Sequence, residues 1–416
     1  MRIQYIFLFL MTFSFAGQLF ADEVSPQLRA LQRLAEDGNN EAQLELALTY
    51  LEGRNGADPD ADLAWEWLEK AAQKRIENGI EVQNAKAVLN LGICYESYFD
   101  FFDFPQDREK AMNYYMEAYN LGYIRAAHYV GQTYLERGDL QKAVRYLEEA
   151  ATQGFEDDIV LYAQIVFRNP QFNVSKDKAI KLLKLAARRS NSAAQIMLAD
   201  LYAGIYGKQY ADAPTMFDYL WMASAKEPNA MARIGYCYEN GIHVEKDAEV
   251  AEKWYLRAAK GGSPEGYAHL ANLHAQGKLG EQDFAQAFLY LNLAMQQPTP
   301  PNWVIYQYGT YLIEGVGTEK RPAEGFSYIE AAARRGDAAA MDYLSFLYMN
   351  GQAYTAEGET IEASPKQALE WLKRAAEFNH PPAMARYGQY LILDGKKEEG
   401  EQLIQKAKEL GYEVAD

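Results

Sequence analysis

The stretch AMARIGYCY, from Ala230 to Tyr238, recurs almost unchanged as AMARYGQYL, from Ala383 to Leu391. Such a copy either duplicates an active site or belongs to a scaffold that repeats one structural unit. Gly235 serves as a reference position, and small residues recur along the chain at intervals of about 36 residues, a period typical of helical repeats. These small residues are Ala47, Gly92, Gly131, Ala163, Ala199, Gly235, Ala271, Gly309, Ser345 and Gly388. Because the copies occur along nearly the whole chain, they favour a repeated scaffold over a duplicated active site.

A second signature follows each small residue. It combines a small residue, an aromatic residue or Leu three positions later, and a further apolar residue, as in Ala251–Trp254–Tyr255. Apolar and small residues three or four positions apart predict two amphipathic helices in each unit. One such pair cannot bury its whole apolar face, so neighbouring pairs must stack. The sequence therefore predicts an all-α protein, a right-handed α-solenoid of about ten stacked helix–turn–helix repeats.

The repeat also resembles a known family. The segment LGICY, from Leu91 to Tyr95, fits the tetratricopeptide pattern, and the segment from Ile234 to Gly262 is similar to the Sel-one-like repeat, a branch of that superfamily. The resemblance extends over roughly residues 42–412. It implies a tetratricopeptide-like solenoid that binds proteins, and it implies no particular reaction, because a repeat specifies a shape.

The ends of the chain differ from the repeats. Residues 1–21 combine Arg2, an apolar run from Ile6 to Phe15 and a cleavage point after Ala21, which predicts a secretory signal peptide, with an uncleaved anchor as the alternative. Residues 22–41 are predicted to form an N-terminal capping helix, residues 42–412 the solenoid, and residues 396–412 a charged C-terminal capping helix. We therefore expect an exported protein, periplasmic or else secreted or on the cell surface, without stable membrane insertion after signal cleavage.

The formal net charge of −17 bears on the choice of partner. A surface of this sign repels the phosphates of nucleic acids and anionic lipids. It suits a basic or neutral protein partner, and it also favours solubility.

Few residues carry a catalytic or metal-binding pattern. Cys94 and Cys237 occupy equivalent positions in distant repeats, which predicts two buried free thiols and no bridge between them. His274 stands where other repeats have Tyr, so we expect a core histidine. Ser175 and Lys178 match the Ser-x-x-Lys spacing of serine β-lactamases, but they precede a predicted helix, where Ser acts as a cap. We therefore expect no enzyme, no catalytic residue, no metal and no cofactor.

By the resemblance, the first helix of each pair lines a concave groove, and the residue after the small position points into it. Polar and aromatic side chains there could bind an extended peptide, with acidic residues one turn further on adding negative charge. The alternative is that these residues only face water. The predicted groove residues are Gln132, Gln164, Asp200, Tyr236, Glu239, Asn272, Thr310, Glu314, Phe346 and Gln389.

One turn is unusually aromatic. Residues 96–107 contain Phe99, Phe101, Phe102 and Phe104. These rings either extend the core of the second repeat or form an exposed docking patch.

These observations favour an exported, non-enzymatic scaffold that holds a protein partner in its groove. The first alternative is a hydrolase of β-lactams or cell-wall material, which the resemblance implies for cysteine-rich members of the family. This chain lacks their cysteine pattern and any clustered nucleophile and base, which disfavours it. The second alternative is a secreted factor that binds a host protein. Self-association stays open.

Overall fold

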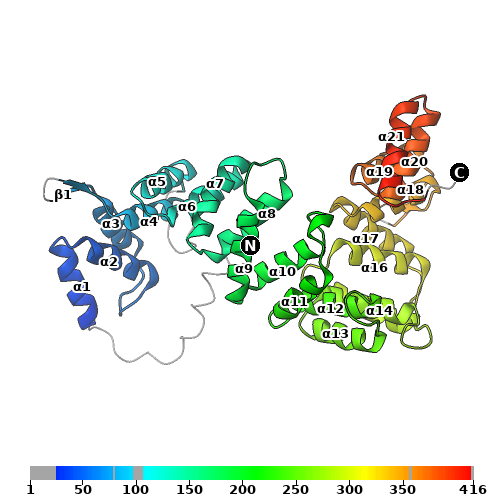
Figure 1. Ribbon diagram of the computed structural model, residues 1–416, viewed down its shortest axis with the longest axis horizontal. Helices are drawn as coiled ribbons and strands as arrows, with labels where there is room; N and C mark the ends of the chain where they lie inside the picture. Colours follow the sequence, from blue (N-terminus) through cyan, green and yellow to red (C-terminus); the bar gives the residue numbers. More distant parts are fainter. Residues whose placement is uncertain (1–24, 78–79, 97–105, 356–357, 414–416) are drawn as a thin grey trace. The chain divides into compact units, whose positions relative to one another are not determined.

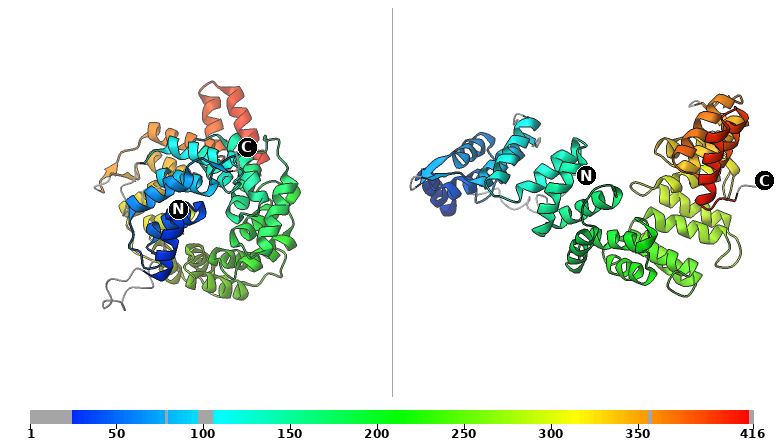
Figure 2. Two further views of the ribbon diagram at one scale, coloured as in Figure 1. Left: turned by 90° about the vertical axis from the view of Figure 1, so that its left-hand side faces the viewer. Right: turned by 45° about the horizontal axis from the view of Figure 1, so that its top comes forward.

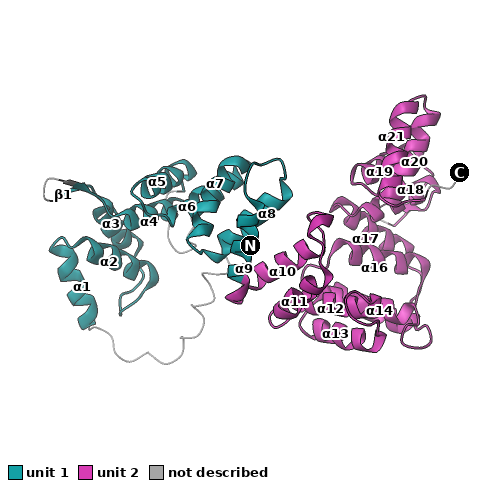
Figure 3. Ribbon diagram, in the orientation of Figure 1, with its two compact units in different colours: residues 1–186 teal, residues 187–416 magenta. Residues whose placement is uncertain are grey.

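The computed structural model describes residues 25–77, 80–96, 106–355 and 358–413. These residues form α-helices, one short 3₁₀ helix and two short β-hairpins (Figure 1). The chain divides into two compact units, residues 1–186 and 187–416 (Figure 3).

Unit 1 begins with α1 (Pro26–Glu36), which packs against the first helix pair. Three more pairs follow, and the last helix ends just inside unit 2. The pairs are α2 (Asn40–Glu52) with α3 (Ala61–Ala72), α4 (Ala85–Glu96) with α5 (Arg108–Asn120), α6 (Ala126–Glu136) with α7 (Leu140–Thr152), and α8 (Glu156–Arg168) with α9 (Lys176–Arg188).

Unit 2 contains six pairs, and Figure 2 shows the helices from two further sides. The pairs are α10 (Ser192–Tyr202) with α11 (Ala213–Ala223), α12 (Pro228–Asn240) with α13 (Ala248–Lys260), α14 (Pro264–Ala275) with α15 (Phe284–Met295), α16 (Asn302–Glu314) with α17 (Pro322–Arg334), α18 (Ala338–Met349) with α19 (Pro365–Glu377), and α20 (Pro381–Leu393) with α21 (Lys397–Glu409). The 3₁₀ helix η2 (Lys208–Tyr210) lies in the turn between α10 and α11. The ten helix pairs confirm the expected all-α repeat architecture.

The small reference residue lets the two helices of a pair touch. A Cβ atom added to Gly235 would lie 2.7 Å from ring carbon Cδ1 of Tyr255 on the second helix. At Gly131 the same added atom would lie 2.7 Å from Cγ of Leu147. Both distances are shorter than a carbon–carbon van der Waals contact, so these positions need glycine for packing.

The tyrosine three residues after the reference position stacks on an aromatic ring of the second helix. The ring centroids of Tyr95 and Tyr114 are 5.5 Å apart, and those of Tyr202 and Tyr219 are 5.9 Å apart. His274 takes the tyrosine's place beside Tyr290, at 5.4 Å. Offset aromatic pairs at such distances add to the stability that burial gives.

A backbone hydrogen bond closes most of the turns between the two helices of a pair. In the turn before α13, the amide of Asp247 donates to the carbonyl of Tyr238 at 2.9 Å, and its carboxylate accepts from the amide of Val250, also at 2.9 Å. Asp60, Asp107, Asp139, Asp212 and Asp283 repeat both bonds at the corresponding turns. One side chain thus caps the second helix while its backbone fixes the turn.

The two β-hairpins were not expected from the repeat. β1 (Arg75–Glu77) pairs with β2 (Ile80–Val82) between α3 and α4, and β3 (Ala353–Tyr354) pairs with β4 (Thr360–Ile361) between α18 and α19. Both occupy places where the spacing between repeats is longer. The sequence Asn78–Gly79 between alternating side chains is a hairpin signal that could have predicted the first.

Some predicted segments lie outside the described residues, among them the signal peptide at 1–21 and the aromatic residues Phe99, Phe101, Phe102 and Phe104. Among the residues that the structure does describe, no helix is long and apolar enough to cross a membrane. The division into an N-terminal capping helix, a solenoid and a C-terminal capping helix stays a prediction.

Candidate binding surface

The first helices of unit 2 lie closer to one another than the second helices do. Helices α12, α14, α16 and α18 contact one another in succession, and no comparable contact joins successive second helices among the described residues. The first helices therefore occupy the inner side of the stack. In each such helix, the second residue and the residues four, seven and eleven positions after it share one face. We call this face of the first helices α10, α12, α14, α16, α18 and α20 the inner stripe.

Tyr236 and Phe346 are exposed aromatic residues of the inner stripe. Their exposed fractions are 46% and 48%, high values for large apolar side chains on helices whose neighbouring residues are buried. Gln389 on α20 and Glu314 on α16 are also exposed. These four predicted residues are therefore exposed to solvent.

Three other predicted residues already make contacts within the protein. Asp200 on α10 binds Arg233 on α12, with 2.7 Å between Oδ1 and the guanidinium nitrogen. The Oδ1 atom of Asn272 accepts a hydrogen bond from Gln307 of the next first helix. The hydroxyl of Thr310 donates to the carbonyl of Gln307 at 2.8 Å. Asp200 and Asn272 therefore join successive repeats.

The expectation for Glu239 was wrong. Its exposed fraction is 6%, and its carboxylate accepts from the hydroxyl of Tyr255 at 2.5 Å and pairs with Nζ of Lys278 at 2.6 Å. Burial, followed by this hydrogen bond, raises the pKa of Tyr255. The position one turn after Gly235 points between the helices, so Glu239 adds no free negative charge to the inner stripe.

The remaining predicted residues belong to unit 1. Gln132 lies on α6 and Gln164 on α8, and both are partly exposed. Eight of the ten predicted groove residues thus belong to unit 2.

An aromatic row on the same face was not predicted from the sequence. The ring of His269 lies 5.8 Å from that of Tyr236 and 5.5 Å from that of Trp303, and it stacks on Tyr255 at 4.8 Å. Burial lowers the pKa of His269. The row could have been found by following the helical period backwards from each predicted groove residue.

The Ser-x-x-Lys pattern of Ser175 and Lys178 makes contacts that hold a helix end. The hydroxyl of Ser175 accepts from the amide of Lys178 at 3.2 Å, and Nζ of Lys178 pairs with Glu148 at 2.7 Å. Ser175 therefore caps α9, as expected.

The two thiols are free and buried, which confirms the sequence prediction. Burial raises the pKa of Cys94 to about 12 and that of Cys237 to about 11. No cluster of three metal-ligating side chains occurs in the part of the chain that the structure describes.

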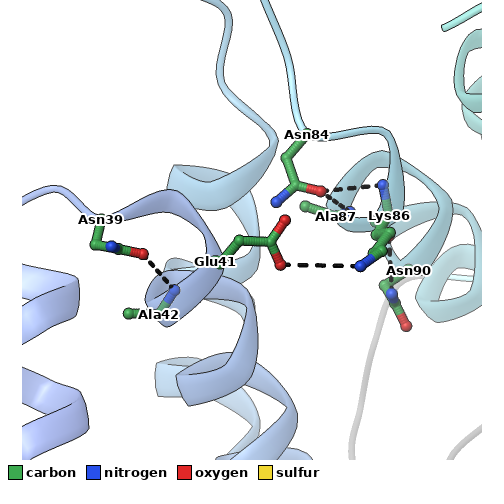
Figure 4. Close-up of polar contacts among 7 residues, drawn as sticks. All are labelled: Asn39, Glu41, Ala42, Asn84, Lys86, Ala87 and Asn90. Atoms are coloured by element: carbon green, nitrogen blue, oxygen red, sulfur yellow. Dashed lines mark hydrogen bonds and ion pairs between the residues drawn. The ribbon is translucent and has the colours of Figure 1, made fainter.

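A separate polar pocket of about 400 Å³ lies in unit 1, between the starts of α2 and α4. Polar side chains of its lining serve the helix ends: Asn84 Oδ1 accepts from the amides of Lys86 and Ala87, and Lys86 lies 4.0 Å from Glu41 (Figure 4). Asn84 Nδ2 has no hydrogen-bond partner among the described residues, and it is itself buried.

Comparison with known proteins gives one family. The family model described as Sel1 repeat matches residues 40–75, 85–123, 118–155, 172–191, 228–263, 264–297, 305–337, 338–380 and 381–412. These matches extend over most of the chain and both units.

Two curated relatives show the level of identity and how much of each chain is similar. The chain is 26% identical to the Sel1-repeat-containing protein YjcO of Escherichia coli K12, over 48% of this chain and 90% of that protein. It is 24% identical to the alginate biosynthesis protein AlgK of Pseudomonas syringae pv. tomato, over 58% of this chain and 53% of that protein.

Two solved structures share the fold. One is c5321, a protective antigen of uropathogenic Escherichia coli strains with an SLR fold, which aligns with a TM-score of 0.57 at 23% identity over 92% of this chain and 80% of its own. The other is a Sel1 repeat protein from Oxalobacter formigenes, with a TM-score of 0.51 at 18% identity over 92% of this chain and 98% of its own. At these identities the likeness shows the fold alone.

Proposed function

The chain belongs to the Sel1 repeat family, and from this premise we propose that it is a scaffold that binds a protein partner along the inner stripe of unit 2. One observation carries the proposal: Tyr236 and Phe346 expose about half of their side chains on the face where the first helices converge. Binding energy at protein interfaces is concentrated in aromatic anchors surrounded by polar groups. The exposed Glu314 on α16 and Gln389 on α20 supply polar groups on neighbouring first helices.

An extended segment of the partner suits this face. The inner stripe runs across successive helices, so a chain laid across them meets one set of side chains in each repeat. Amide side chains can bond both the donors and the acceptors of an extended backbone. We propose further that the protein is exported, on the strength of the predicted signal peptide at residues 1–21.

Affinity capture from envelope extract tests the proposal. The bait is the chain from Asp22 onward, compared with a variant that carries Tyr236→Ala, Phe346→Ala and Gln389→Ala. The matched control replaces two exposed side chains of second helices, Trp221→Ala on α11 and Leu289→Ala on α15. Circular dichroism verifies that all three proteins are folded.

The proposal expects a protein that the parent and the control retain and the inner-stripe variant loses. Equal retention by all three proteins would place the binding surface elsewhere. Fractionation of cells that express the full chain tests export: recovery of an unprocessed chain from the cytoplasm would contradict it.

A further inference from the structure

Glu265 is a partly buried carboxylate on the inner stripe, at the start of α14. Among the residues that the structure describes, it makes no ion pair and no hydrogen bond through its side chain. Burial raises the pKa of this carboxyl group, and the charge of Arg233 opposes the rise. A bound cation stabilises a partly buried carboxylate that has no ion pair more strongly than it stabilises an exposed carboxylate.

Arg233 does not neutralise this site fully. Its guanidinium binds Asp200 at 2.7 Å, so two carboxylates share one cation. The three side chains together carry a formal charge of −1 when all are ionised, within a chain whose formal net charge is −17.

Aromatic rings belong to the same helical face as this carboxylate. His269 follows Glu265 by one helical turn, and its ring lies between those of Tyr236 and Trp303, at 5.8 and 5.5 Å. Trp303 holds the same stripe position on α16 that Glu265 holds on α14. Burial lowers the pKa of His269, which disfavours a positive charge on its ring.

We propose that Glu265, Tyr236, His269 and Trp303 form an acidic–aromatic patch that binds a lysine or arginine side chain from an extended segment of a partner protein. The carboxylate supplies an opposite charge, and the ring faces attract the cation through their quadrupoles. The negative field of the chain steers a basic segment towards the patch. The inference rests on the proposed function, because it names the chemistry of the partner for the same inner stripe.

A random peptide library displayed on phage provides the probe. The library is selected on the full chain from Asp22 onward, on Glu265→Gln and on the control Glu281→Gln, which removes an exposed carboxylate in the turn before α15. A selected peptide is then synthesised, together with versions in which each Lys or Arg is replaced by Gln, and its Kd is measured by fluorescence anisotropy.

We expect Lys or Arg at one fixed place in the selected peptides. Glu265→Gln should weaken binding of the parent peptide about tenfold or more, and Glu281→Gln should leave the Kd unchanged. Replacing the critical Lys or Arg by Gln should make the Kd insensitive to Glu265→Gln, which a general loss of stability would not produce.

The contradicting outcomes separate the two proposals. Peptides that compete at Tyr236 and Phe346 but carry no fixed basic residue, or whose Kd does not respond to Glu265→Gln, would overturn the acidic–aromatic patch and leave the scaffold function standing. Selection of no peptide, or binding unaffected by Tyr236→Ala with Phe346→Ala, would overturn both.

Discussion

At the residue scale, the fold depends on pairing one very small residue with one large residue across each helix pair. Gly92 faces Tyr115, Gly235 faces Tyr255, and an added Cβ atom would lie 2.6 to 2.7 Å from either ring. The ring packs on the bare backbone, and its hydroxyl then reaches a glutamate one turn after the glycine: Tyr115 binds Glu96 at 2.6 Å. The glycine, the tyrosine and the glutamate act as one unit.

Gly235→Ala should therefore destabilise the protein. The added methyl group would collide with Tyr255, and overpacking of a filled site costs about 1–3 kcal/mol. Urea unfolding followed by circular dichroism measures the change in the free energy of unfolding. The control Gln389→Ala, exposed on α20, should stay within about 0.5 kcal/mol of the parent. Equal stability of Gly235→Ala and the parent would show that the helices do not approach as closely as described.

The thiols give a second prediction at this scale. Because burial raises the pKa of Cys94 to about 12 and that of Cys237 to about 11, neither forms its thiolate near pH 8. An aromatic disulfide reagent at pH 8 should leave the native protein unmodified and should react with both thiols in urea. The reactivity of the native protein should increase only as the pH is raised towards 11. Rapid reaction of either thiol at pH 8 without denaturant would contradict its burial.

At the scale of elements, Glu239 links three of them. Glu239 lies on α12, accepts a hydrogen bond from Tyr255 on α13, and pairs with Lys278 in the turn after α14. A buried carboxylate with two partners has its charge compensated. Losing one partner leaves the charge buried without compensation and lowers the free energy of unfolding. The contact thus ties one repeat to the next.

Lys278→Met should destabilise unit 2 by about 1–3 kcal/mol, because it leaves Glu239 buried without its cation. Adding Glu239→Gln should recover part of this loss, since the neutral amide needs no counter-charge. The measurement is urea unfolding of both variants and the parent. A double variant less stable than Lys278→Met would contradict the claim that the unpaired charge causes the loss.

Helix pairs could be predicted from the sequence more readily than the side chains that line a binding surface. The recurring Gly235 position and the small-aromatic-apolar signature that follows it are local signals, and they predicted the two helices of each repeat. Glu239 was misassigned because a position one turn from a known inward residue can point between helices or into the groove, and only the packing of Tyr255 decides which. The row of His269 and Trp303 joins side chains from successive repeats, so the helical period reveals it only when it is followed from the predicted groove residues of each repeat.

At the scale of the whole molecule, stability comes from contacts between neighbouring helix pairs. Each helix of unit 2 after α10 packs against the one before it, and buried clusters form along the unit from its own residues. Stacked repeats of this kind gain stability from each repeat and from each interface with a neighbour. Unit 2 therefore contains the contacts that hold its pairs together.

Residues 187–416 should accordingly fold when expressed alone. The fragment keeps Asn191, whose side chain caps α10 by accepting from the amide of Ala194 at 2.8 Å. We expect a helical circular dichroism spectrum and a cooperative thermal transition. A fragment without a cooperative transition would contradict the independence of the unit. A folded fragment would also allow the inner stripe to be studied without unit 1.

Hydrogen exchange measured by mass spectrometry, on the chain from Asp22 onward with and without a bound partner segment, tests the central claim most directly. Binding at the inner stripe predicts slower exchange in α12, α14, α16 and α18, with α13, α15 and α17 unchanged or less affected. Protection confined to the second helices or to unit 1 would contradict the account and would move the binding surface away from Tyr236 and Phe346.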